Sequence, residues 1–151
     1  MMLNMLLVLL LLMQTGQKQQ MLSPSELLHL AAIRGETPAV DMLLKMGVAV
    51  DSVDSHGKTP LHDTCLKGHV DTARLLIERG AKIGAQDEDG ATPLHDAALG
   101  GNTKVIELLL EQKADIDAHD SKGLSALDYA KKMERTDAIR VLQSERQKKP
   151  K

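Results

Sequence analysis

One pattern recurs along this chain at a fixed interval of 33 residues, and it limits the possible folds more than any other feature of the sequence. The most complete copy is Asp-Glu-Asp-Gly-Ala-Thr-Pro-Leu-His, which begins at Asp87. The same key residue types begin again at Asp54, and a weaker version begins at Asp120. A period of this length indicates that the chain is built from repeated units that stack on one another.

Each copy contains a turn followed by the start of a helix. In the central copy, Asp87 can bind local backbone amides and Gly90 tolerates a positive φ, so the spacing predicts a tight turn. Thr92 is a good N-cap, and Pro93 suits the first helical position. His95 lies three residues after the cap and can return a hydrogen bond to it. We therefore expect a helix to begin at each Thr-Pro-Leu-His.

A turn and two helices that repeat every 33 residues, with Thr-Pro-Leu-His at the first helix, resemble the ankyrin repeat. The resemblance extends from about Leu22 to Leu142. It implies an all-α fold, an ankyrin-repeat solenoid of stacked helix-turn-helix units joined by β-hairpin-like loops. The expected ankyrin repeat domain covers residues 21–144, with repeats at about 22–53, 54–86, 87–119 and 120–144.

The first and last repeats are expected to act as caps. The first opens with Ser23-Pro24-Ser25-Glu26, a capping box with Pro at the first helical position, but it lacks the Asp-x-x-Gly turn. The fourth replaces three apolar residues of the third with Lys131, Lys132 and Gln143, so its outer side is polar.

At two positions, a residue with a side chain replaces the glycine that follows a helix in other repeats. Lys113 stands where the earlier repeats have Gly47 and Gly80, and Glu134 stands where the third repeat has Gly101. If the Lys113 position is left-handed, a side chain there costs about 1 kcal/mol. Because Glu134 replaces a glycine, we expect the C-terminal end of the stack to be the least stable part.

The composition fits a stack of short helices. With one Tyr, no Phe and no Trp, the core must consist of Leu, Ile, Val, Ala and Met. A globular enzyme usually carries more aromatic side chains. The net charge of -2 does not favour nucleic acid as a partner. The single cysteine excludes an internal disulfide framework and fits a reducing compartment, so we expect a cytoplasmic protein.

The two ends of the chain are expected to lie outside the repeats. Residues 1–13 are almost wholly Leu, Met and Val, but a bilayer crossing needs about 20 apolar residues. The run suits the apolar region of a signal peptide, although no Lys or Arg precedes it and no good cleavage site follows. We expect residues 1–20 to be an extension outside the fold; an export or anchoring signal is the alternative. Residues 145–151 are expected to be a frayed basic tail.

Two groups of reactive side chains have a simpler structural interpretation. His29, His62 and His95 recur once per repeat, which separates them along the stack and predicts a structural role at the helix start. In ankyrin repeats this histidine joins the hydrogen bonds of the capped turn, and the resemblance implies the same here. Cys65 is equivalent to alanines in the neighbouring repeats, so a small buried side chain explains it better than a reactive thiol.

The sequence predicts no catalytic, cofactor-binding or metal-binding residue. Asp87-Glu88-Asp89-Gly90 is similar to part of a calcium loop, but Ala85 then occupies the position of the first ligand. The chain has no phosphate-binding glycine loop and no Gly-x-Ser-x-Gly elbow. We therefore expect that the protein is not an enzyme.

Residues that differ between the repeats are available to contact a partner protein, whereas residues that recur at the 33-residue interval stabilise the fold. Ankyrin-repeat proteins generally bind other proteins through the loop tips and the first helices, and the resemblance implies the same surface here. The residues expected to contact a partner are Ser55, His56, Lys58, Leu66, Lys67, Glu88, Asp89, Ala91, Leu99, Ser121, Lys122 and Leu124.

These features predict a protein–protein interaction module, an adaptor or scaffold. The expected surface has an acidic centre at Glu88, Asp89 and Asp96, so we expect a partner protein with basic side chains. Two alternatives stay open: a small inhibitor or chaperone-like subunit of an enzyme, and a secreted, periplasmic or membrane-tethered protein if the apolar run is a signal. We expect a monomer with no small-molecule substrate, no nucleic acid partner, and membrane contact only through such a signal or anchor.

Overall fold

The computed structural model describes residues 21–148, so the expectations for residues 1–20 and 149–151 lie outside the described residues. Within residues 21–148 the chain forms eight α-helices. They are α2 (Pro24–Arg34), α3 (Thr37–Lys45), α4 (Pro60–Lys67), α5 (Val70–Glu78), α6 (Pro93–Gly100), α7 (Thr103–Glu111), α8 (Ala126–Lys132) and α9 (Thr136–Lys148). None of these helices combines the length and the apolar character that a membrane crossing requires.

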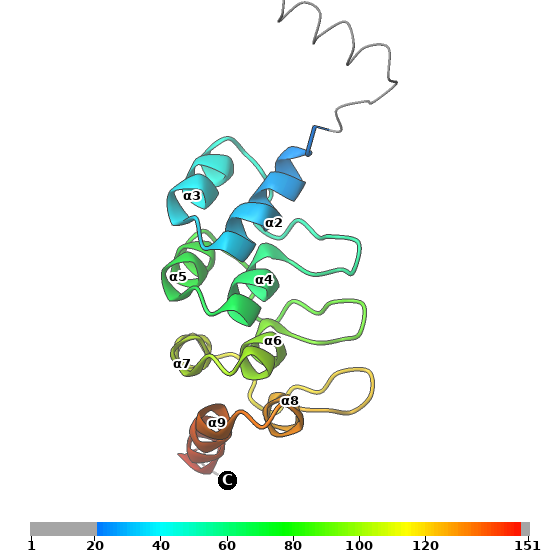
Figure 1. Cartoon of the computed structure of the whole chain (residues 1–151), viewed down its shortest axis with the longest axis vertical. Coiled ribbons are helices and arrows are strands. Elements are labelled where there is room, and N and C mark those ends of the chain that lie inside the picture. Colours follow the sequence, from blue (N-terminus) through cyan, green and yellow to red (C-terminus); the bar gives the residue numbers. More distant parts are fainter. Residues whose placement is uncertain (1–20, 149–151) are drawn as a thin grey trace, which may run out of the picture.

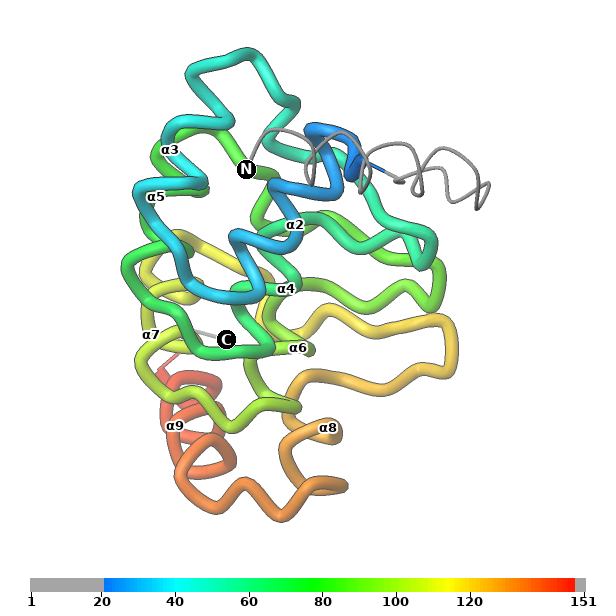
Figure 2. The backbone as a smooth tube through the Cα atoms, turned by 45° about the horizontal axis from the view of Figure 1, so that its top comes forward, coloured from blue at the N-terminus to red at the C-terminus, as the bar shows by residue number. Residues whose placement is uncertain are grey.

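The helices stack in two columns, as Figure 1 shows. The first helices of the pairs, α2, α4, α6 and α8, contact one another in order, and α3, α5, α7 and α9 form the second column. The loops that join one pair to the next project to the same side of the stack (Figures 1 and 2). The predicted all-α solenoid is therefore confirmed.

The predicted caps begin the first helices. The Ser23 hydroxyl accepts the backbone N–H of Glu26 at 3.2 Å, and the Glu26 carboxylate accepts the N–H of Ser23 at 2.6 Å. At α4, Nδ1 of His62 lies 3.1 Å from the backbone nitrogen and 2.9 Å from the hydroxyl of Thr59. The same two contacts recur at Thr92. A polar side chain in the first helical turn thus caps the start of each of these helices, as the sequence predicts.

Aliphatic side chains fill the space between the columns. Leu61 and Leu94 from the first column, and Leu76, Ile106 and Leu109 from the second, are at most 1% exposed. Burying one such side chain contributes about 1.5–3 kcal/mol. The core therefore has the aliphatic character that the composition predicts.

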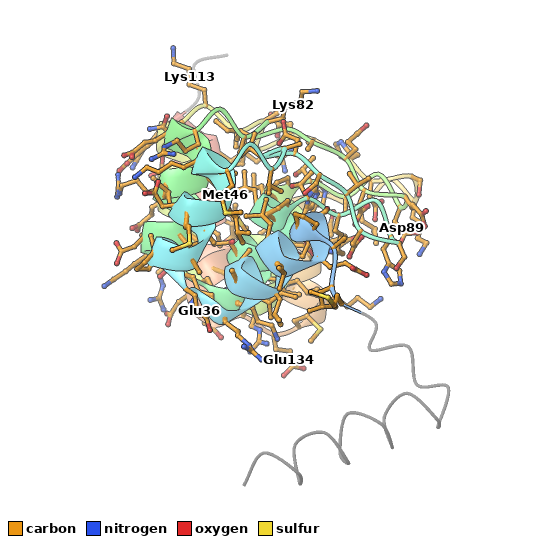
Figure 3. All side chains as sticks on the ribbon, turned by 90° about the horizontal axis from the view of Figure 1, so that it is seen from above. Glu36, Met46, Lys82, Asp89, Lys113 and Glu134 are labelled. Carbon is orange, nitrogen blue, oxygen red and sulfur yellow. The ribbon has the colours of Figure 1, made fainter. Side chains whose placement is uncertain are left out.

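Both residues that stand in place of a glycine have a left-handed backbone. Lys113 has a φ of 65° and Glu134 a φ of 54°, and they are the non-glycine residues with positive φ in the described part of the chain. Figure 3, which looks down the stack, shows both side chains at the rim. A side chain in this region costs about 1 kcal/mol, and one such position in a repeat is tolerated.

The expectation of a frayed tail from residue 145 is wrong for residues 145–148. These residues form the last turn of α9, and the Arg146 guanidinium lies 3.1 Å from the Asp117 carboxylate on the preceding loop. The sequence pattern missed this because the last helix is longer than its equivalents. The positive charges that suggested a solvated tail also suit the C-terminal end of a helix dipole.

Candidate functional site

Each of the projecting loops contains an aspartate whose carboxylate accepts backbone hydrogen bonds within that loop. The Asp54 carboxylate accepts the backbone N–H groups of His56 and Lys58 at 2.8 and 2.9 Å. Asp87 and Asp120 accept the equivalent pairs in their own loops. Burial alone would raise the pKa of Asp54, but the two backbone hydrogen bonds outweigh it and lower the pKa. The ionised carboxylate therefore fixes the turn and gives the loop tip a defined shape.

The loop tips are also joined to one another. The backbone N–H of Glu88 donates to the carbonyl oxygen of His56 at 3.1 Å. In the next loop, Ser121 donates to the carbonyl oxygen of Asp89 from its N–H at 2.9 Å and from its hydroxyl at 2.7 Å. The tips thus form a continuous edge, visible as the stacked loops in Figure 2. Figure 3 shows Asp89 at the outermost point of this edge.

Most residues predicted to contact a partner are accessible, and their role stays a prediction. The exposed ones are Ser55, His56, Lys67, Glu88, Asp89, Ser121 and Lys122. The half-buried ones are Lys58, Leu66, Leu99 and Leu124. The prediction is wrong for Ala91, which is 3% exposed. Its carbonyl oxygen accepts Nε2–H of His62 at 3.1 Å, and this contact holds the residue inside the stack.

Lys58 and Asp96 form an ion pair that links two repeats. The Lys58 ammonium lies 2.6 Å from the Asp96 carboxylate and 3.5 Å from that of Asp87. Burial alone would lower the pKa of Lys58, but these two carboxylates outweigh it and raise the pKa. Asp96 is 2% exposed, so the expectation that it forms part of an acidic surface is wrong. The acidic surface is restricted to Glu88 and Asp89 at the tip.

His29 makes bonds that differ from those of the other two repeated histidines. Its Nδ1 lies 2.7 Å from the Asp63 carboxylate, and its Nε2 lies 3.1 Å from the carbonyl oxygen of Ser52. Two acceptors suit the charged imidazolium, in which both nitrogens donate. Burial alone would lower the pKa of His29, but the hydrogen bond to Asp63 and its charge raise it. A buried ion pair therefore joins the first repeat to the second.

His62 and His95 act as neutral links between repeats. With Nδ1 accepting at the cap, Nε2–H of His62 donates to the next loop, and Nε2–H of His95 donates to the Leu124 carbonyl oxygen at 3.0 Å. Burial lowers the pKa of His62, which favours this neutral form. The predicted structural role of these two histidines is confirmed.

Two side-chain clusters bring ligand-type atoms within 4.8 Å of one another: His29, Asp54 and Asp63 in one, and His62, Asp87 and Asp96 in the other. In the first, His29 is hydrogen-bonded to Asp63. In the second, the Lys58 ammonium already lies against both carboxylates. The ligand atoms are therefore engaged in hydrogen bonds and ion pairs that hold the fold, and the clusters are explained without a cation.

A row of aliphatic side chains crosses three repeats on the first helices. Ile33, Leu66 and Leu99 occupy equivalent positions near the ends of α2, α4 and α6. The carbonyl oxygen of each accepts a hydrogen bond, at 3.0 to 3.1 Å, from the side chain 36 residues later; the donors are His69, Asn102 and Arg135. Ile33 is 38% exposed and the two leucines are half-buried. Sequence reasoning missed Ile33, although the 33-residue phase relates it to Leu66.

A cleft of about 560 Å³ opens at the Ile33 end of this row. Its walls come from α2, from the two residues before it and from the first projecting loop: Leu22, Ser23, Ser25, Glu26, His29, Leu30, Ile33, Val53, Asp54 and Ser55. The lining is mostly apolar and includes the acidic residues Glu26 and Asp54, which suits a large apolar side chain flanked by a polar or basic group.

A family model described as ankyrin repeats, in three copies, matches this chain over residues 2–87 and again over residues 80–151. No curated protein matches the sequence. Ankyrin repeats generally serve in protein–protein interaction, and proteins of this family are typically not enzymes.

Proposed function

The chain belongs to the ankyrin-repeat family, and from this premise we propose that it is an adaptor that binds a segment of another protein along the first-helix face of the stack. The observation that carries the proposal is the aliphatic row of Ile33, Leu66 and Leu99, which begins at the cleft beside α2. An apolar row that spans three repeats favours a partner segment that lies across the stack.

The charges at the loop tips suggest the chemistry that flanks the apolar part of the partner. Glu88 and Asp89 are exposed at the edge of the stack, whereas the nearby Lys58 is engaged inside the fold. A partner segment with aliphatic side chains on the row and Lys or Arg facing the tip fits this arrangement. The described surface offers no Trp or Phe anchor, so we expect moderate affinity.

The test uses the full chain as bait in an extract of the native cells, beside two charge-reversed variants. One carries Glu88→Lys and Asp89→Lys at the loop tip. The matched control carries Glu78→Lys and Glu107→Lys, which make the same charge change on exposed positions of the outer helices α5 and α7. A protein held by the natural chain and by the control, but lost by the tip variant, is the expected result.

A captured protein is then titrated against the full chain by calorimetry. We expect the tip variant to bind at least about tenfold more weakly and binding to weaken with salt, because the tip charges are exposed. Leu66→Ser combined with Leu99→Ser should remove most of the remaining affinity. Equal binding by all variants, or loss of binding only in the outer-helix control, would show that the partner uses another surface.

A further inference from the structure

A pair of carboxylates at the cleft beside α2 recurs one repeat later, where a lysine of the chain is bound to it. Asp54 lines the cleft, and 33 residues after it stands Asp87. Asp63 contacts His29, which also lines the cleft, and 33 residues after Asp63 stands Asp96. In both pairs, one oxygen of each carboxylate lies within 4.8 Å of the other. The two pairs therefore have the same residues at a similar spacing.

The later pair binds the ammonium of Lys58. This ammonium lies 2.6 Å from the Asp96 carboxylate and 3.5 Å from the Asp87 carboxylate. At the earlier pair a serine takes the place of this lysine, because Ser25 is the residue 33 positions before Lys58 and it lies in the wall of the cleft. The chain itself thus shows which group such a pair of carboxylates binds.

The earlier pair is accessible to a ligand. The side chain of Asp54 is 31% exposed, whereas that of Asp87 is 6% exposed. The side chain of Asp63 is 11% exposed, whereas that of Asp96 is 3% exposed. Solvent therefore reaches the first pair of carboxylates at the position where Lys58 covers the second pair.

His29 offsets only part of the negative charge at this cleft. Its imidazolium donates to one oxygen of Asp63 at 2.7 Å. Asp54 accepts both of its loop hydrogen bonds at Oδ1. Glu26, in the first turn of α2, adds a third carboxylate to the cleft wall. Three carboxylates and one imidazolium in or beside the cleft leave a net negative charge, which favours a cation.

The other walls suit the aliphatic part of a lysine side chain. Leu30 is half-buried, whereas Ile33 is 38% and Val53 60% exposed, and all three line the cleft. Lysine packs its aliphatic stem on apolar surface and keeps its ammonium in a polar environment. We propose that the cleft is a lysine-binding pocket, in which a lysine of the partner segment places its ammonium at Asp54 and Asp63 and its stem along this apolar wall. The proposal rests on the proposed binding function, because it names the residue with which the partner segment enters the cleft.

Two short peptides test the pocket in the full chain. One is acetyl-Ala-Lys-Ala-amide, and the other carries norleucine in place of lysine, which keeps most of the aliphatic stem and lacks the ammonium. Each peptide is titrated against isotope-labelled protein, and the amide resonances of Ile33, Val53 and Ser55 report binding in the cleft. We expect the lysine peptide to bind there at least about tenfold more tightly than the norleucine peptide, since it adds hydrogen bonds between charged groups.

A matched pair of variants identifies the carboxylate. Asp54→Asn removes the charge from the cleft wall and keeps an oxygen that can accept the two loop hydrogen bonds. Asp120→Asn makes the same change in another loop, where Asp120 accepts the equivalent pair of bonds. We expect Asp54→Asn to weaken binding of the lysine peptide at least about fivefold, and Asp120→Asn to leave it unchanged. Thermal melts verify that both variants are folded.

Glu26→Gln provides a second variant of the cleft. Glutamine preserves the capping box at Ser23, so the start of α2 is retained while a carboxylate is lost from the cleft wall. It should weaken binding of the lysine peptide by about two- to threefold, because this carboxylate is exposed.

Equal binding of the two peptides would overturn the proposal, and so would equal losses in Asp54→Asn and Asp120→Asn. Resonance shifts at Glu88 and Asp89 without shifts at the cleft would also overturn it. The result is distinguishable from that of the capture experiment. Binding of the lysine peptide in the cleft, together with a tip variant that still captures the same protein, would uphold the pocket and contradict the proposed use of the tip. Capture as expected, with no lysine peptide in the cleft, would overturn the pocket alone.

Discussion

Replacing Lys58 with methionine should destabilise the fold, although the residue belongs to a projecting loop. The substitution keeps most of the side-chain volume and removes the ammonium that lies 2.6 Å from Asp96 and 3.5 Å from Asp87. Both carboxylates are deeply buried, with side chains that are 3% and 6% exposed. Methionine is also compatible with the site, because the equivalent positions of the next repeats hold Ala91 and Leu124.

The magnitude follows from leaving buried carboxylates without a cation. Breaking a buried ion pair by removing one partner costs about 3–5 kcal/mol, and partial exposure of Lys58 places this case near about 3 kcal/mol. The loss should shrink as the pH falls, because the unpaired carboxyl groups then take up protons. Adding Asp96→Asn to Lys58→Met should recover at least about 1 kcal/mol, since the two side chains are in contact.

Urea unfolding followed by circular dichroism measures these free energies. Lys122→Met is the control, because Lys122 is exposed and its replacement should change stability by less than about 0.5 kcal/mol. If Lys58→Met were no worse than this control, or if Asp96→Asn added a further full loss to it, the ion pair would not hold the second and third repeats together.

Three further predictions concern other parts of the stack. Leu109→Ala should cost about 2–5 kcal/mol because the side chain is fully buried, whereas Glu88→Ala should be nearly neutral in the same urea experiment; equal losses would contradict the division into core and tip. The ion pair with Asp63 raises the pKa of His29, so its contribution to stability is present below the ordinary histidine pKa and is lost as the pH rises through the folded value. The stability difference between the natural chain and His29→Gln should therefore narrow from pH 6 to pH 9, and a difference that stays constant would exclude the charged pair. Lys113→Gly should stabilise the chain by about 1 kcal/mol because φ is 65° there, and a thermal melt with no rise in midpoint would count against backbone strain.

The sequence was sufficient to predict the features that depend on nearby residues. Helix starts at Ser23, Thr59 and Thr92 follow from the chemistry of the cap and the next helical turn. A left-handed backbone at Lys113 follows from its alignment with Gly47 and Gly80 at the 33-residue interval, because a repeat that stacks regularly imposes the same turn whether or not glycine is present. The two-column architecture follows from the same period.

Contacts between repeats were harder to predict because they join residues that are 29 to 38 positions apart in the sequence. Lys58 looks like a variable loop residue, yet its ammonium reaches Asp96 in the next repeat, 38 residues later. His29 looks like the third member of a repeated set, yet without a threonine at its cap it turns to Asp63. Ala91 occupies the position equivalent to Lys58, yet it is 3% exposed and its carbonyl oxygen accepts Nε2–H of His62. Variation between repeats therefore does not by itself indicate a surface position.

Residues that stabilise the stack lie close to the proposed binding surface, and this affects how binding data on the protein should be interpreted. The links through His29, Lys58 and His62 lie on the same first-helix side as the aliphatic row, so breaking one of them loosens the stack that aligns the row. A weaker complex after such a change would not identify the residue as a contact. Glu88 and Asp89 are different, because their side chains are exposed and only their backbone groups join the neighbouring loops. Loss of affinity in the variant at these two positions, with the free energy of unfolding unchanged, is therefore the result that would separate a contact with the partner from support of the fold.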